Sequence, residues 1–112
     1  MTKEPKLTKY LPLTEATFYI MMALVEPMHG YAIMQQVEEV SMGRVKIGPG
    51  TLYGAFSTLE KEGLIEMVSE ENRRKNYLLT DKGKQVLALQ AERVMIMNQQ
   101  AQQIVQKISQ TY

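Results

Sequence analysis

The sequence predicts a mainly α-helical fold with one small β-hairpin, and three observations lead to this prediction. Apolar residues recur at three- and four-residue spacing in four stretches, which is the periodicity of amphipathic helices. Two β-rich runs, Leu64 to Ser69 and Lys75 to Thr80, flank the charged segment Glu70 to Arg74 and are typical of a hairpin. From Asp81 onward no proline interrupts the chain, so one long helix is expected to follow the hairpin.

The stretch from Gly48 to Gly63 is the one around which the fold is organised. One stripe of this helix is apolar and must be buried; it consists of Leu52, Ala55, Phe56 and Leu59. The opposite face is polar and carries almost no bulk apolar surface; it consists of Tyr53, Gly54, Ser57, Thr58 and Lys61. Pro49 is acceptable in the first turn, the Thr51 hydroxyl is expected to satisfy a free backbone N–H, and Gly63 ends the helix.

Three further elements precede this helix. A first helix begins at the N-cap Thr14 and ends before Pro27, and its expected inner face is Thr17, Ile20, Met21, Leu24 and Val25. A second helix runs from Gly30 to Ser41, and its stripe is Ile33, Val37 and Val40, widened by Met34. Residues 44–47 alternate cation and apolar side chain, which predicts a very short strand with Val45 and Ile47 turned inward.

The order helix, helix, strand, helix, hairpin is that of a winged helix-turn-helix. In this fold the third helix binds in a DNA groove, and the hairpin, called the wing, contacts the adjacent DNA backbone. We therefore expect a winged-helix DNA-binding domain over residues 13–80. Residues 1–12, with Lys3, Lys6 and Lys9, are expected to form a mostly extended N-terminal arm.

The last helix, residues 81–112, is capped by Thr80 and Asp81 and carries a heptad pattern. Six apolar residues and one asparagine repeat at alternating four- and three-residue spacing; they are Leu87, Ala91, Val94, Asn98, Ala101, Val105 and Ile108. One small domain cannot cover such a long stripe, whereas a second copy of the chain can. The sequence therefore predicts a C-terminal dimerisation helix and a homodimer.

Charge is distributed unevenly although the formal net charge is only +1. Residues 11–43 hold four acids and no lysine or arginine, whereas residues 73–84 hold five cations against Asp81 alone. The positive potential is therefore local. The absence of cysteine excludes disulfides and thiolate metal sites, and no cofactor or metal is expected. The first residues lack an apolar signal region, so a soluble cytoplasmic protein is expected.

The candidate DNA-binding residues lie on the polar helix face and at the wing tip. They are Lys46, Thr51, Tyr53, Gly54, Ser57, Thr58, Lys61, Arg73, Arg74 and Lys75. A phenol such as Tyr53 can hydrogen-bond a phosphate and pack on a sugar, and the wing cations suit phosphate or minor-groove contacts. The alternatives are a Tyr53 ring packed on the hairpin, a solvated charge run at the tip, and ordinary surface lysines at 46 and 61.

Two other groups of residues could carry chemistry. His29 is the only histidine and stands just ahead of a helix, where a capping or packing role outweighs catalysis. The nine methionines mostly suit core packing, but Met95, Met97 and Asn98 on the last helix are candidates for lining a small-ligand site, because a thioether adapts to varied apolar shapes.

Four sequence blocks resemble the PadR family of bacterial transcriptional regulators, in its branch with a short C-terminal helix. The blocks, in order, are Met28–Tyr31, Pro49–Tyr53, Leu59–Ile65 and Tyr77–Gly83. The resemblance implies a homodimeric winged-helix repressor that binds inverted repeats of double-stranded DNA, often in its own promoter. Some members of this family release DNA when a small phenolic or planar apolar compound binds, so the resemblance also implies such a response.

The function predicted is therefore sequence-specific DNA binding by a transcriptional regulator, a repressor relieved by a small apolar or aromatic ligand, and no enzymatic reaction. The first alternative is a winged-helix protein-interaction module, which would need an apolar face where Tyr53, Ser57, Thr58 and Lys61 stand. The second is a small hydrolase or nuclease, which needs clustered acids or a nucleophile with its base. The sequence shows neither arrangement.

Overall fold

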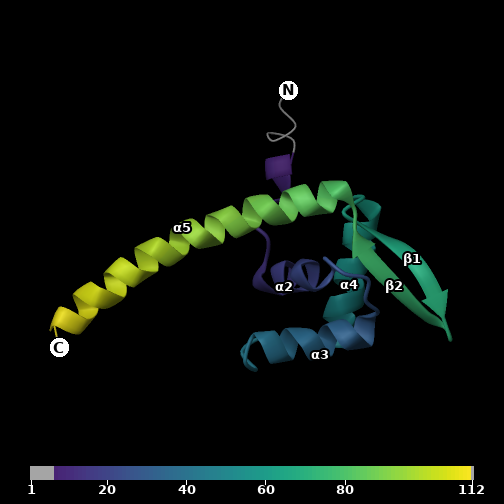
Figure 1. Ribbon diagram of the computed structural model, residues 1–112, viewed down its shortest axis with the longest axis horizontal. Coiled ribbons are helices and arrows are strands. Elements are labelled where there is room, and N and C mark those ends of the chain that lie inside the picture. Colours follow the sequence, from purple (N-terminus) through teal and green to yellow (C-terminus); the bar gives the residue numbers. More distant parts are fainter. Residues whose placement is uncertain (1–6, 112) are drawn as a thin grey trace.

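A computed structural model describes residues 7–111 of the chain and confirms the mainly helical fold with one hairpin (Figure 1). The elements are, in order, the 3-10 turn η1 (Thr8–Tyr10), the helices α2 (Glu15–Ala23), α3 (Gly30–Val40) and α4 (Pro49–Lys61), the strands β1 (Ile65–Glu71) and β2 (Arg74–Leu79), and the helix α5 (Asp81–Thr111). Within this part of the chain, no helix combines the length and apolarity that crossing a bilayer requires.

The helix starts follow from local capping groups. Thr14 caps α2, with its hydroxyl accepting the Thr17 N–H at 3.1 Å, and His29 caps α3, with Nδ1 accepting the Ala32 N–H at 3.4 Å. The expectation for Thr51 is wrong, because the N-cap of α4 is Gly48 and no side chain caps this helix. Thr51 lies inside the first turn, and Pro49, which has no N–H, already removes one of the free donors.

The core lies between α2, α3, α4, the hairpin and the first turns of α5. Its most deeply buried side chains are Ile20, Met21, Leu24, Ile33, Val37, Leu52, Leu64, Ile65, Leu79 and Val86. The prediction of burial is wrong for two residues, because Val25 and Val40 are 54% and 55% exposed. Val25 follows the end of α2, so helical spacing no longer sets its direction, and Val40 borders an unfilled hollow of about 240 Å³ between α2 and α3.

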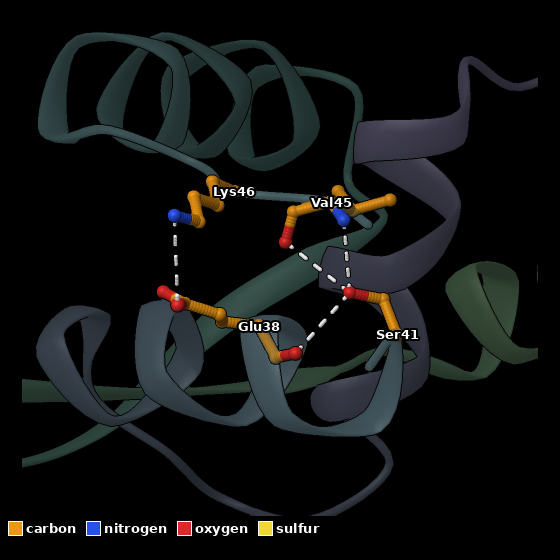
Figure 2. A network of polar contacts seen from close by, with 4 residues as sticks. All are labelled: Glu38, Ser41, Val45 and Lys46. Carbon is orange, nitrogen blue, oxygen red and sulfur yellow. Dashed lines mark hydrogen bonds and ion pairs between the residues drawn. The ribbon is translucent and has the colours of Figure 1, made fainter. Parts of the chain in front are cut away.

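Residues 44–47 form a loop rather than the expected strand. Val45 and Ile47 are buried as the alternation predicted, but no strand of the described chain pairs with this segment. Figure 2 shows why the segment is nevertheless ordered: the buried Ser41 hydroxyl accepts the Val45 N–H at 2.9 Å and shares its hydrogen between the Glu38 and Val45 carbonyls, both at 3.3 Å. A side chain thus replaces the ladder that a strand would need.

The hairpin β1–β2, which we call the wing, is an antiparallel pair in which Ile65 faces Leu79 and Glu71 faces Arg74. Its tip is the two-residue turn Asn72–Arg73, and both residues have positive φ, 52° and 66°, as in a type I′ turn. The wing is held against the helices because the Met28 and Tyr77 N–H groups donate to each other's carbonyls at 3.1 and 3.0 Å. The lower part of the wing is therefore fastened to the segment between α2 and α3.

Helix α5 has two unlike halves, as Figure 1 makes visible where it arches over α2 and then runs clear of the domain. In its first half Val86 is buried, and the buried Gln90 accepts the Leu13 N–H at 3.0 Å; sequence spacing identified neither residue. Of the predicted dimer stripe, Leu87, Ala91 and Val94 are half-buried, and Asn98, Ala101, Val105 and Ile108 are exposed. Every side chain of residues 95–110, which we call the tail, is exposed.

The N-terminal segment is less extended than expected. Lys3 and Lys6 lie outside the described residues, but Leu7 is buried in the core and the η1 turn packs on α5. The segment 7–10 therefore belongs to the packed structure, because Leu7 is buried and Tyr10 is partly buried against the core.

Candidate nucleic-acid interface

Helix α4 has the two faces that its sequence predicted. Leu52, Phe56 and Leu59 are buried, and Ala55 is half-buried between them. The outer face is exposed and holds Thr51, Tyr53, Gly54, Ser57, Thr58 and Lys61. It also holds one carboxylate, Glu60, which was not among the predicted polar positions. The solvent-exposed face of α4 therefore consists of hydroxyl groups, one cation and one anion.

Tyr53 is half exposed, but its ring is held by neighbours on two sides. It meets the Phe56 ring edge-on, with ring centroids 5.9 Å apart, and it covers the start of α3, where a Cβ added to Gly30 would stand 2.7 Å from the Tyr53 hydroxyl oxygen. Phe56 in turn contacts the Tyr77 ring of the wing, with ring centroids 4.6 Å apart. Tyr53 and the wing residue Tyr77 thus both pack on Phe56, and a side chain at position 30 would meet the Tyr53 phenol.

A hollow of about 380 Å³ opens between the start of α3, the start of α4 and the wing. Three segments that are distant in sequence line it, with His29, Gly30, Tyr31, Tyr53, Phe56, Arg73, Arg74, Lys75 and Tyr77. The structure therefore brings Tyr53 together with all three candidate cations of the wing tip. It does not bring Lys46, Ser57, Thr58 or Lys61 to this hollow, since these residues lie elsewhere on the surface.

The chemistry of the hollow favours ligands that accept hydrogen bonds. Burial raises the pKa of the Tyr77 phenol above its ordinary value of 10.0, and the Glu60 carboxylate, Tyr53 and the Glu70 carboxylate add to the rise. The Tyr77 hydroxyl therefore keeps its proton at neutral pH and is available as a donor. Beside three cations, such phenols form a surface suited to anionic oxygen atoms.

Lys46, on the loop before α4, is already close to an acid. Its ammonium lies 4.0 Å from a Glu38 carboxylate oxygen, and both side chains are largely exposed (Figure 2). Such an exposed pair is worth about 0–1 kcal/mol, so Lys46 could exchange this carboxylate for a phosphate at little cost.

Five residues that line the hollow were not predicted as site residues: His29, Gly30 and the three aromatic residues Tyr31, Phe56 and Tyr77. Tyr31 and Tyr77 stand in the blocks that carry the family resemblance, so a signal for them was present in the sequence. Phe56 was assigned to the core, which is correct, but its exposed edge also borders the hollow. Local spacing could not show that these three residues converge.

The candidate ligand residues on the tail do not form one site in the single chain. Met95 and Met97 are 62% and 52% exposed. A shallow hollow of about 420 Å³ runs along the same helix, but it is lined by Asn98, Ala101, Gln102, Val105 and Gln106 and by neither methionine.

The chain was compared with known protein families, with curated proteins and with solved structures. The model of the PadR-like family of transcriptional regulators matches residues 20–89, from α2 into α5. The transcriptional regulator YqjI of Escherichia coli is 32% identical over 66 residues, covering 59% of this chain and 32% of that protein. An uncharacterised 37.1 kDa protein of transposon TN4556 from Streptomyces fradiae is 38% identical over 78 residues, covering 69% of this chain and 22% of that protein.

The solved structures give the same fold. A PadR-like transcription factor from Bacteroides fragilis superposes with a TM-score of 0.65 at 28% identity, covering 80% of this chain and 88% of that chain. Against the two curated relatives, by contrast, the chain spans only about a fifth to a third of their length. Because the family model covers more than half of the chain, from the first core helix to the half of α5 that packs on the domain, this chain belongs to the PadR-like family of transcriptional regulators.

Proposed function

We propose that this chain is a sequence-specific DNA-binding repressor that acts as a homodimer. The observation that carries the proposal is the hollow, in which Tyr53 of α4 and the cations Arg73, Arg74 and Lys75 of the wing share one surface. In this arrangement α4 enters a major groove while the wing lies on the adjacent backbone. One phosphate oxygen at the mouth of the hollow would meet phenolic donors and guanidinium groups together.

Phosphate binding and base reading are divided between two sets of residues. Tyr53, Arg73, Arg74 and Lys75 hold phosphates, and Thr51, Lys46 and Lys61 add contacts along the same backbone. Gly54, Ser57 and Thr58 face the bases, because they are exposed on the outer face of α4. Among the described residues, nothing lies within 4 Å of a Cβ built at Gly54, so DNA can approach the helix closely there.

The homodimer is supported by the tail. Its exposed apolar side chains include Ile104, Val105 and Ile108, on a helix that leaves the domain. A second copy related by two-fold symmetry would cover them and present a second α4, so that the operator would be an inverted repeat with half-sites about one turn of DNA apart.

Relief of repression is assigned to a small apolar or aromatic compound bound between α5 and the partner's winged domain. The exposed thioethers of Met95 and Met97, with the amide of Asn98, support this assignment because they offer adaptable apolar surface and one orienting group. By linkage the effector must bind more weakly when operator is present, by about 5- to 150-fold for a coupling of 1–3 kcal/mol.

The test begins with selection of duplexes from a random-sequence DNA pool by the wild-type chain, followed by anisotropy titrations at several salt concentrations. We expect enrichment of inverted repeats and a steep fall of affinity with salt. The double variant Arg73→Ala, Arg74→Ala should bind every sequence more weakly, with a salt slope reduced by about 0.9 for each phosphate that the variant no longer neutralises. Thr58→Ala should instead change which sequences are preferred.

Lys84→Ala is the matched control, because it removes an exposed cation of α5 that does not line the hollow. If the wing variant kept wild-type affinity and salt slope, the wing would not contact phosphate. If no duplex were enriched, the chain would not be a DNA-binding protein, and a winged-helix protein-interaction module would be favoured.

A further inference from the structure

The C-terminal end of α4 is fastened directly to the first turn of α5. Figure 1 shows α5 beginning beside the hairpin, close to α4. The contact is made by Tyr10, Glu62, Gly63, Leu64, Thr80, Lys82 and Gly83, and we call it the α4–α5 joint. Its residues come from the N-terminal segment, from the end of α4 and from the start of α5.

Side chains of α5 bind the backbone just beyond α4. The Thr80 hydroxyl donates to the Gly63 carbonyl at 2.6 Å and accepts the Gly83 N–H at 3.0 Å, so that one group both caps α5 and holds the end of α4. The Lys82 ammonium donates to the Glu62 carbonyl at 2.9 Å. A cation at this position also interacts favourably with the negative end of the α4 dipole.

The two backbones also touch. Gly83 is buried, and a Cβ at this position would overlap the Leu64 carbonyl oxygen. The Thr80 N–H donates to that same carbonyl at 3.0 Å. Glycine at 83 therefore sets how closely α5 approaches the segment that ends α4, and any larger side chain would push the helix away.

The N-terminal segment adds a third contact to the joint. The Tyr10 hydroxyl donates to a Glu62 carboxylate oxygen at 3.0 Å, and the Lys82 ammonium lies 5.2 Å from the centre of the Tyr10 ring. Tyr10 thus links the end of α4 to the same lysine that binds the Glu62 carbonyl.

We propose that Tyr10, Thr80 and Lys82 are positioning residues that fix the angle between α4 and α5 and thereby set the half-site spacing that the dimer accepts. The inference rests on the proposed DNA-binding function. With 31 residues, α5 is about 46 Å long, so a rigid tilt of about 5°, which also shifts its packing on α2, moves its far end by about 4 Å. One base pair adds about 3.4 Å to the DNA, so a loose joint would blur the choice of spacing by a whole base pair.

The experiment measures affinity of the full chain for duplexes that differ only in spacing. The probes are a duplex enriched by the wild-type protein, the same duplex with one or two base pairs inserted or removed at its centre, and one isolated half-site. For wild-type protein we expect a loss of about tenfold in affinity for a one-base-pair change. The double variant Thr80→Val, Lys82→Met should lose less than about threefold for the same change, with unaltered affinity for the half-site.

Three further variants make the result specific. Thr80→Ser keeps the hydroxyl, and Lys84→Met removes an exposed lysine two residues further along the same helix, so both should show the wild-type spacing profile. Tyr10→Phe removes only the hydrogen bond to Glu62 and leaves the cap of α5 intact, so it should flatten the profile even if the double variant does not fold.

Two results would overturn the positioning role alone. The first is wild-type spacing preference in folded variants that lack these contacts. The second is an equal loss of affinity for every duplex including the half-site, because that pattern means general destabilisation rather than a change of angle. If wild-type protein bound no duplex, the proposed DNA-binding function would fall together with this inference.

Discussion

The winged domain and the tail of α5 have similar apolar periodicity but differ in whether the apolar side chains are buried. In the domain, Leu52, Phe56 and Leu59 follow one another at four- and three-residue spacing along α4 and are buried. In the tail, Ile104, Val105 and Ile108 stand at comparable spacing and remain 53%, 60% and 51% exposed. Periodicity therefore identifies which side chains require burial, and it does not say whether the same chain provides the cover.

This difference separates two sources of stability. The winged domain closes its core with its own helices, hairpin and first α5 turns, so it should fold without a partner. The tail buries nothing, and a helix gains most of its stability from packing. Its order in solution should therefore depend on association with a second copy and hence on protein concentration.

The largest effect should come from truncating the domain core. Leu52→Ala removes a fully buried side chain between α4 and its neighbours and should lower the free energy of unfolding by about 2–5 kcal/mol. The matched change Val105→Ala in the tail should change the free energy of unfolding by less than about 0.5 kcal/mol in protein dilute enough to be monomeric. Urea unfolding followed by circular dichroism measures both. Equal losses would erase the proposed distinction between the two regions.

A smaller effect is expected when charge is placed on the tail. The double variant Val105→Asp, Ile108→Asp should raise the dimer dissociation constant about 100-fold or more, because a dimer would have to bury four carboxylates. Gln103→Asp is the control, since helical spacing puts it on the opposite side of α5 from Val105. Sedimentation velocity over a concentration series reports the result. A double variant that stayed dimeric would show that the partner does not lie on this stripe.

The smallest expected effect is on the stability of the winged domain at alkaline pH, and it comes from Tyr77. Tyr77 has a raised pKa in the folded chain, so between its unfolded value of 10.0 and its folded value the unfolded chain loses this proton first. Stability is therefore unaffected by Tyr77 below about pH 10 and falls above it, by at most about 1.4 kcal/mol per pH unit. Tyr77→Phe should reduce this decline in urea titrations between about pH 9 and 11.5.

Tyr31→Phe removes an exposed phenol from the same hollow and serves as the control for Tyr77. If both variants changed the alkaline decline equally, the effect would not come from burial of Tyr77.

Local signals predicted most of the elements. The caps at Thr14 and Thr80, the positive φ of 74° at Gly63 and the β-rich runs of the hairpin each depend on residues within a few positions of one another. The strand predicted at residues 44–47 is absent, because a strand requires a partner strand, which no local pattern can guarantee. Its alternation was still correct about which side chains are buried.

The sequence by itself determined the helices, the hairpin, the two faces of α4 and the presence of a heptad stripe on the last helix, because each follows from propensity and spacing along one element. Only the tertiary structure decided that Tyr31, Tyr53, Tyr77 and the wing cations share a hollow. It also decided that Tyr10 bonds Glu62, 52 residues away. Such contacts depend on the angles at which elements pack, and those angles result from the fit of the whole core rather than from any single stretch of sequence.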